Sequence, residues 1–442
     1  MGKTYHDIET HSWEEVRRRH EDKLPGQLAY LGENSDFYQR KFSEWDVDVE
    51  SVSTIEEFQE IPFTTKDDQR RNQADPPEEQ PLGTHQAVPT EELSRTISSS
   101  GTTGKPTYFG LTKSDRRSWN EVMKRSFYCA GIDPDDTVIF GSGQTMITGG
   151  TPYFEALTEL GANVVPAGGE STERLLSVMT DLPGDALITT TSHHRYLTER
   201  IPELGFELDE LSITKLVGGG GPGIGNPEIR SELYEQWGAN LVREGMGMGD
   251  VIGCMWSECE FEDGMHYHGQ GHAHVELIDT ETGENVPFEV GSKGELVYTP
   301  LEREATPLLR FKSGDYARVT GVNCQCGRTS PKIRCIGRAD DMVIYKGMNV
   351  FPSAIRDVVS GVEGAMGHTK VIVPTEDKVH FEAPIPIEAV LDPETDRDEA
   401  AVEDDIVDAV RTQLKVRVRP QLVDFSEIEL SEYKTEQVIV RK

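Results

Sequence analysis

Basic residues, aromatic residues and long apolar runs are all scarce in this chain of 442 residues. Lys and Arg total 44 against 78 Asp and Glu, which gives a formal net charge of −34. Nucleic-acid binding requires clustered Lys and Arg opposite the phosphates, so this balance argues against a nucleic-acid partner. No apolar run approaches the ~18 residues of a membrane span, and the first residues lack the apolar core of a signal peptide. We therefore expect a cytoplasmic protein without a membrane partner, and the widely spread acidity indicates adaptation to a salt-rich environment.

Cysteine is scarce as well, but five of the 6 cysteines lie in one histidine-rich part of the sequence. In a reducing compartment such crowding favours a metal site over disulfides. Cys324 and Cys326 form a C-x-C-G turn, and Cys259 lies upstream of His266 in the sequence CEFEDGMH. Thiolates and an imidazole are the ligands of structural zinc, so these four residues predict one Zn²⁺. Three nearby histidines are alternatives to His266: His268, His272 and His274.

The length suggests two or three structural units, and the pattern of apolar residues changes along the chain. Residues 12–72 have the spacing of amphipathic helices. Between about 134 and 245, short apolar runs alternate with amphipathic stretches, which is typical of an α/β unit with a largely parallel sheet. Residues 273–334 change to a pattern of strands and turns. The tail after residue 341 alternates strands and helices as a small α+β unit does, so we expect an α/β protein with a separate C-terminal unit.

The most specific local motif is RTISSSGTTGKPTYFG, in which a short apolar strand leads into a loop of glycines and hydroxyl residues. Glycines let backbone N–H groups turn inward, hydroxyls add donors and a lysine adds positive charge, which together suit a polyphosphate. The spacing is not that of a Walker A loop, because that motif needs Gly at Ser99 and Ser or Thr in place of Pro106. The expected phosphate-binding residues are Ser99, Ser100, Gly101, Thr102, Thr103, Gly104 and Lys105.

This loop and several later motifs resemble those of the adenylate-forming superfamily, and more closely its phenylacetate–CoA ligase branch. The segments ENSDFYQRKF and IPFTTKDDQRRN precede the loop, and PLEREATPLLRFKSGDYARV and CQCGRTSPKIRCIGRADDMVIYKGMNVFPSAI follow it in that branch's order. The resemblance covers nearly the whole chain. It implies an N-terminal AMP-binding domain over residues 1–337, with a helical lead-in (1–75) and a β subdomain (about 265–335). A small mobile α+β lid would follow over residues 338–442.

The resemblance also implies roles for residues outside the loop. Asp315 matches the aspartate that holds the ribose hydroxyls of the nucleotide, and Arg338 matches an arginine near the nucleotide. Asp250 stands where the family has a glutamate that helps to bind Mg²⁺, an ion that prefers hard oxygen ligands. Met246 and Gly247 match the adenine-binding segment, in which Met246 replaces an aromatic residue.

The C-terminal lid carries a further set of implied residues. Lys434 matches the lysine that bridges the reacting carboxylate and the α-phosphate, where a positioned cation would stabilise pentavalent phosphorus. Asp340 and Asp341 match the hinge, and Lys346 with Gly347 would face the thiol tunnel in the second half-reaction. By the same resemblance, the acid pocket would be lined by Phe140, Met146, His193 and Tyr196.

These implied residues belong to an ATP-dependent, AMP-forming acid–CoA ligase that uses ATP, Mg²⁺ and CoA. The expected substrate is an aryl or arylacetic acid such as phenylacetate. The lid would rotate between formation of the acyl-adenylate and transfer to CoA, which keeps water from the adenylate. One alternative is an adenylate-forming enzyme with an acceptor other than CoA. A second is a degenerate nucleotide- or metal-binding homologue, because Met246 and Gly249 depart from the family pattern. A homodimer is compatible with the sequence.

Overall fold

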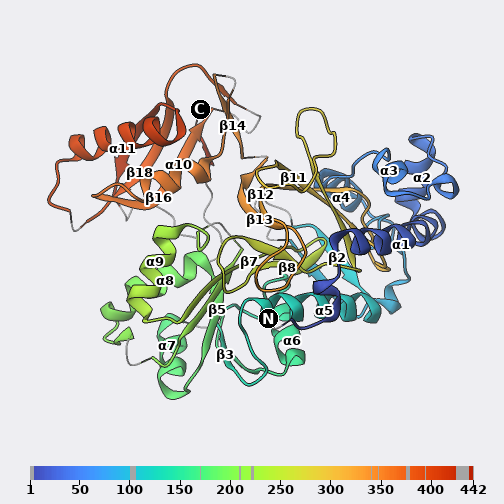
Figure 1. The fold of residues 1–442 in the computed structure, drawn as a ribbon, viewed down its shortest axis with the longest axis horizontal. Coiled ribbons are helices and arrows are strands. Elements are labelled where there is room, and N and C mark those ends of the chain that lie inside the picture. The colour runs from blue at the N-terminus through green and yellow to red at the C-terminus, as the bar shows by residue number, and fades with distance from the viewer. Residues whose placement is uncertain are drawn as a thin grey trace.

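A mixed sheet of 11 strands forms the centre of the computed structural model of the chain (Figure 1). One half of this sheet is parallel and carries helices between its strands, and the other half is antiparallel. The structure describes residues 4–99, 106–169, 171–208, 211–220, 223–339, 341–346, 348–374, 379–393, 395–424 and 438–441.

The parallel half consists of β3 (Thr137–Phe140), β4 (Asn163–Pro166), β5 (Ala186–Thr190), β6 (Lys215–Gly219) and β7 (Leu241–Met248). These strands pair in the order β4-β3-β5-β6-β7. Their connections are the helices α6 (Thr151–Leu160), α7 (Thr172–Asp181), α8 (Thr191–Glu203) and α9 (Pro227–Trp237). This alternation confirms the α/β unit that the sequence predicts between residues 134 and 245.

Both faces of the parallel half are covered, which explains why its strands are mostly apolar. On β3, Val138 and Phe140 join a core that includes Ala156 of α6. Ile139 faces the other way and joins the core that includes Leu176 of α7. Side chains alternate along a strand, so the position of a residue within β3 decides which core it enters.

The antiparallel half continues the same sheet through β8 (Ile252–Glu258), β9 (Met265–Tyr267), β13 (Lys332–Arg338), β12 (Phe311–Gly321), β11 (Lys293–Pro300) and β10 (Ala273–Ile278), in that spatial order. The sequence predicts a β subdomain over about 265–335. In the structure, β8 pairs antiparallel with both β7 and β9, so the strands of that region extend the central sheet.

Helices lead into the sheet, as the sequence predicts for residues 12–72. They are α1 (Trp13–Asn34), α2 (Asp36–Glu44), α3 (Ile55–Gln59) and α4 (Lys66–Ala74), with short 3-10 turns at Asp7–Thr10, Val49–Ser51 and Thr90–Glu92. Leu28 and Phe58 of these helices share a core with Leu301 and Leu309. The hairpin of β1 (Arg95–Ser98) and β2 (Tyr108–Leu111) then leads into α5 (Lys113–Cys129), whose first turn is capped by Thr112.

The C-terminal elements have a core of their own and lie at the upper left of the view (Figure 1). One sheet contains β14 (Val343–Tyr345), β15 (Met348–Val350) and β17 (His380–Phe381). A second contains β16 (Ala365–Val373), β18 (Ile385–Leu391), β19 (Val418–Val423) and β20 (Val438–Val440), with α10 (Pro352–Val359) and α11 (Glu399–Leu414) packed nearby. Within the described ranges, none of the helices has the length and apolar character that crossing a bilayer requires.

Candidate active site

The carboxyl ends of β3, β5, β6 and β7 meet at one edge of the parallel half, which is where ligands bind in open α/β sheets. The loop after β3 reaches the base of the glycine-rich loop, because the Ser98 N–H donates to the Met146 carbonyl at 2.9 Å. The same loop packs on the turn after β7. A side-chain carbon at Gly249 would lie 2.7 Å from Thr148 Oγ1, so only glycine fits there. Three segments far apart in the sequence therefore meet at this edge.

The residues on either side of the glycine-rich loop pair with each other in a closed stem. The Ser99 N–H donates to the Thr107 carbonyl, and the two side-chain hydroxyls lie 2.9 Å apart. Ser99 is the only predicted phosphate-binding residue of the loop that the structure describes. Ser100, Gly101, Thr102, Thr103, Gly104 and Lys105 lie outside the described residues.

Asp250 occupies a tight turn between β7 and β8, in which the Val251 N–H donates to the Met248 carbonyl at 3.0 Å. Its side chain is buried, and Oδ2 accepts a hydrogen bond from Lys66 Nζ at 2.9 Å. Oδ1 has no hydrogen-bond partner within the described part of the chain, and neither does the buried Thr148 Oγ1 next to the turn. Buried polar atoms are rarely left without a partner, so this turn is a candidate position for a ligand.

Lys66 is a functional candidate that the sequence motifs did not reveal. It is the first residue of α4, beside the positive end of the helix dipole, where a cation is normally unfavourable. This unfavourable position was the one sign in the sequence that Lys66 could have a special role. The structure explains the position, because the Lys66 ammonium pairs with the buried carboxylate of Asp250, 184 residues away in the sequence.

Met246 and Gly247 lie on β7 where the pairing with β8 is irregular. Met246 is half-buried against the main core. A side-chain carbon at Gly247 would lie 1.2 Å from the Gly253 carbonyl oxygen, so the bulge itself requires glycine. The close approach of the two strands therefore accounts for Gly247 without any ligand.

Asp315 and Arg338 face each other across β12 and β13, as the register of the two strands requires. Arg338 Nη1 lies 3.1 Å from Asp315 Oδ1, and both side chains are partly buried. The Asp315 N–H donates to Ser313 Oγ at 2.9 Å, which fixes the backbone next to the carboxylate. The structure thus brings together two residues that the family resemblance placed near the nucleotide.

The predicted lid residues are only partly described. Lys346 is exposed, has a positive φ of 49° and holds its ammonium 5.5 Å from the centre of the Tyr345 ring. Asp341 is partly buried. Asp340, Gly347 and Lys434 lie outside the described residues.

The four residues predicted for an acid pocket separate in the structure. Phe140 is fully buried and its ring centre lies 6.3 Å from that of Phe154, so it belongs to the core and not to an open pocket. Met146 is 47% exposed at the edge described above. His193 and Tyr196 stack at 6.0 Å on α8, and His193 Nδ1 lies 2.8 Å from Thr189 Oγ1 at the end of β5.

The predicted metal ligands form one cluster. The ligand atoms of Cys259, His266, Cys324 and Cys326 all lie within 4.8 Å of one another. The Cys259 and Cys324 sulfurs are 3.8 Å apart, and Cys326 Sγ lies 3.5 Å from His266 Nε2. Tetrahedral zinc, bound at about 2.3 Å to sulfur and about 2.0–2.1 Å to nitrogen, separates two sulfurs by about 3.8 Å and sulfur from nitrogen by about 3.5 Å. The donor set therefore fits a four-coordinate ion.

The other histidines of the region have different partners, which decides between the alternatives to His266. His268 Nε2 lies 2.9 Å from Ser257 Oγ, and the His274 ring pairs with His20.

Beside the cluster, Arg328 Nε donates to Glu9 Oε1 at 2.8 Å. Burial raises the pKa of Glu9, but the hydrogen bond with His268 and the charges of His268 and Arg328 outweigh burial and lower it to about 2.

Known proteins are similar in sequence to most of this chain. Residues 347–442 match a family model described as the AMP-binding enzyme C-terminal domain. The phenylacetate-coenzyme A ligase of Thermus thermophilus is 34% identical over 372 residues, which cover 84% of this chain and 81% of the relative. The enzyme of the same name from Escherichia coli is 31% identical over 83% of this chain and 81% of the relative.

Solved structures of one enzyme in two states superimpose on nearly the whole chain. A 2-hydroxyisobutyryl-CoA ligase in the postadenylation state, in complex with R3-HIB-AMP, superimposes with a TM-score of 0.87 at 25% identity, over 98% of this chain and 91% of that one. The same enzyme with 2-HIB-AMP and CoA in the thioesterification state gives a TM-score of 0.70 at 26% identity and the same coverage. The chain therefore superimposes better on the postadenylation structure of that enzyme than on its thioesterification structure.

Proposed function

The chain belongs to the phenylacetate–coenzyme A ligase family, and we propose that this AMP-forming acid–CoA ligase activates an aryl or arylacetic acid such as phenylacetate. The observation that carries the proposal is the arrangement at the edge of the parallel strands. There the stem of the glycine-rich loop, the buried Asp250 and the ammonium of Lys66 meet. The acid is suggested by the relatives at 34% and 31% identity, which are named phenylacetate-coenzyme A ligases.

In the proposed complex, residues 99–105 cradle the phosphates of ATP with backbone N–H groups, hydroxyls and the Lys105 ammonium. Asp315 accepts hydrogen bonds from the ribose hydroxyls. The ion pair with Arg338 at 3.1 Å supports this role, because it holds the orientation of the carboxylate. Met246 covers the adenine, since its polarizable thioether suits a flat aromatic ring.

Asp250 is the proposed magnesium ligand. A carboxylate oxygen is a suitable donor for this ion, and Oδ1 has no hydrogen bond within the described residues. Bound Mg²⁺ would neutralise phosphate charge during the attack on the α-phosphorus. Lys66 already holds Oδ2 at 2.9 Å, so it orients the carboxylate and adds a second positive charge beside the phosphates.

The proposed reaction has two steps. A carboxylate oxygen of the acid attacks the α-phosphorus, the new P–O bond forms and pyrophosphate leaves. Lys434 bridges the two anions in this step. The CoA thiolate then attacks the acyl carbon, the thioester forms and AMP leaves, after the lid has turned Lys346 and Gly347 towards the thiol, with residues 340 and 341 as the hinge.

The wall of the acid pocket is proposed to contain His193, Tyr196 and Met146. The hydrogen bond between Thr189 and His193 fixes the stacked pair at the carboxyl end of β5. Flat side chains and a thioether are good partners for an aromatic acid. Phe140 is left out of this wall because its ring is in the core.

Cys259, His266, Cys324 and Cys326 are proposed to hold a structural Zn²⁺. The sulfur–sulfur and sulfur–nitrogen separations support tetrahedral coordination by all four residues, which leaves no position for a substrate. The cluster joins the turn after β8 to β9 and to the turn before β13. Bound zinc would therefore stabilise the antiparallel half of the sheet, away from the chemistry.

The test is acid-dependent pyrophosphate exchange at high salt with phenylacetate, benzoate, 2-hydroxyisobutyrate and acetate, followed by detection of the thioester. We expect phenylacetate or benzoate to give both signals. Asp250→Asn should lose most of the exchange, whereas Asp279→Asn, at a surface turn, should not. Exchange without thioester would select a different acceptor, and nucleotide binding without exchange under any acid would refute the ligase function.

A further inference from the structure

Arg303 is a buried cation in the connection between β11 and β12. Only 4% of this residue is exposed. Removing a guanidinium from water is unfavourable unless hydrogen bonds and opposite charges replace the solvent. The partners of Arg303 therefore show what it holds in place.

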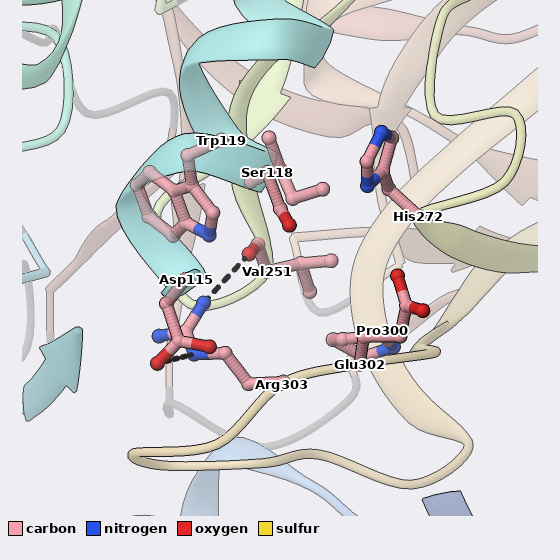
Figure 2. A pocket seen from close by; sticks show the side chains of 9 residues that line it. Asp115, Ser118, Trp119, Val251, His272, Pro300, Glu302 and Arg303 are labelled. Carbon is pink, nitrogen blue, oxygen red and sulfur yellow. Dashed lines mark hydrogen bonds and ion pairs between the residues drawn. The ribbon is translucent and has the colours of Figure 1, made fainter. Parts of the chain in front are cut away.

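The two ends of the guanidinium donate to two different parts of the proposed nucleotide site. Nη1 donates to the carbonyl of Val251 at 3.1 Å (Figure 2), and Val251 directly follows Asp250. Nη2 donates to the carbonyl of Gly110 at 3.0 Å, on the strand β2 that follows the glycine-rich loop. One side chain thus joins the Asp250 turn to the hairpin that carries the loop.

The remaining surroundings keep Arg303 charged and fixed. Its Nε lies 3.6 Å from Asp115 Oδ2, and its Cζ lies 5.2 Å from the centre of the Trp119 ring. Asp115 also accepts hydrogen bonds from the backbone N–H groups of Glu304 at 2.8 Å and Ala305 at 3.0 Å, which immobilises the carboxylate. Burial lowers the pKa of Arg303, and the carboxylates of Asp115 and Asp250 oppose that shift.

We propose that Arg303 is a positioning residue that fixes the Asp250 turn against the β1–β2 hairpin, so that magnesium and the phosphates meet ligands already in place. Arg303 itself touches neither. The inference rests on the proposed role of Asp250 as magnesium ligand. A lysine could not substitute, because its single ammonium lacks the rigid fork that reaches two carbonyls at once.

A small pocket lies beside the guanidinium and offers a means to test it (Figure 2). Ser118, His272 and Glu302 contribute to its lining, together with Arg303. Within the described part of the chain, Trp119 Nε1 and Arg303 Nε have no hydrogen-bond partner. Truncation of Arg303 would join the vacated space to this pocket, so a free guanidinium ion could enter and restore the two hydrogen bonds.

The experiment measures binding of Mn²⁺ to the complex of the full chain with ATP, by electron paramagnetic resonance, together with the KM values for the nucleotide and the acid. Arg303→Lys should weaken Mn²⁺ binding on the order of 10–100-fold, as loss of a ligand's supporting partner typically does. The KM for the acid should change less than about twofold, because the acid pocket is on other loops. Arg303→Ala should regain Mn²⁺ binding when guanidinium is added at low, non-denaturing concentration.

The matched control is Arg310→Lys. Arg310 is also buried and also donates to two backbone carbonyls, those of Gln59 and Ile61, but its side chain pairs with Glu276 and not with the Asp250 turn. This variant should melt at lower temperature with unchanged Mn²⁺ affinity. If Arg303→Lys lowers only the melting temperature, or weakens Mn²⁺ binding no more than Arg310→Lys, positioning is refuted. If wild-type protein binds no Mn²⁺ with ATP, the proposed function fails as well, which separates the two results.

Discussion

Two buried histidines between α1 and β10 should make the protein sensitive to mild acid. His20 Nε2 accepts the Gly271 N–H at 3.0 Å, so a neutral His20 carries its proton on Nδ1. That proton points to His274 Nδ1 at 3.3 Å, which must then be the acceptor. Protonation of either ring would bring two donors together, so the folded state holds both rings neutral.

The direction of the effect follows from the pKa values. Burial lowers the pKa of His20 well below 6.5, and burial with the charges of Arg17 and Arg310 lowers that of His274 to about 3. In the unfolded chain both titrate near 6.5. Between these values the unfolded state binds more protons, so the free energy of unfolding decreases as the pH decreases below 6.5. From about pH 7.5 to about pH 5.5, each histidine removes about 1.4 kcal/mol of stability, or about 3 kcal/mol for the pair.

His274→Gln isolates one of the two contributions, since the glutamine oxygen can accept the same hydrogen bond from His20 without titrating. Urea unfolding, followed by circular dichroism at both pH values, should show a loss of stability about 1.4 kcal/mol smaller than in the wild type. His380→Gln, at an exposed position, should lose as much as the wild type. Equal losses in His274→Gln and wild type would refute the assignment of neutral, locked rings.

Three further outcomes are expected. Asp315→Ala should raise the KM for ATP on the order of 10–100-fold with an unchanged circular dichroism spectrum, because a charge-assisted clamp on the ribose is lost while the side chain is only partly buried. An unchanged KM would remove Asp315 from the site. Metal analysis should find about one zinc per chain, and Cys324→Ser with Cys326→Ser should lose the metal and melt at lower temperature; a metal-free wild type of equal stability would contradict the cluster. Lys434→Ala should lower the rate of adenylate formation on the order of 10²–10³-fold, and thioester formation from a supplied acyl-adenylate should stay unchanged. If both steps are lost together, Lys434 is a structural residue.

The fold was largely predictable from the sequence, because the features that indicate it are local. Short apolar runs and amphipathic stretches alternate between residues 134 and 245, and these became the strands and helices of the parallel half. The glycine-rich loop, the Asp315 segment and the C-terminal segment are contiguous motifs, so their order alone indicated the family. The register of β12 and β13 then placed Asp315 opposite Arg338.

Other features were beyond local pattern. All residues of the run Val138–Phe140 are apolar, since both faces of the sheet are covered, and nothing in the run tells which face Phe140 takes. Four histidines lie within the 15 residues that follow Cys259 in the sequence. Only the packing of the chain places His266, and not the other three, beside the cysteines of the cluster.

The sequence by itself therefore determined the family, the alternation of strands and helices and the identity of the clustered cysteines, since each is carried by neighbours in the chain. The tertiary structure decided which charges meet. Lys66 reaches Asp250 across 184 residues, and Arg303 reaches Gly110 across 193. Such pairs form because a charge buried by folding must find its partner in the same interior, and that partner is set by how the segments pack and not by their spacing in the sequence.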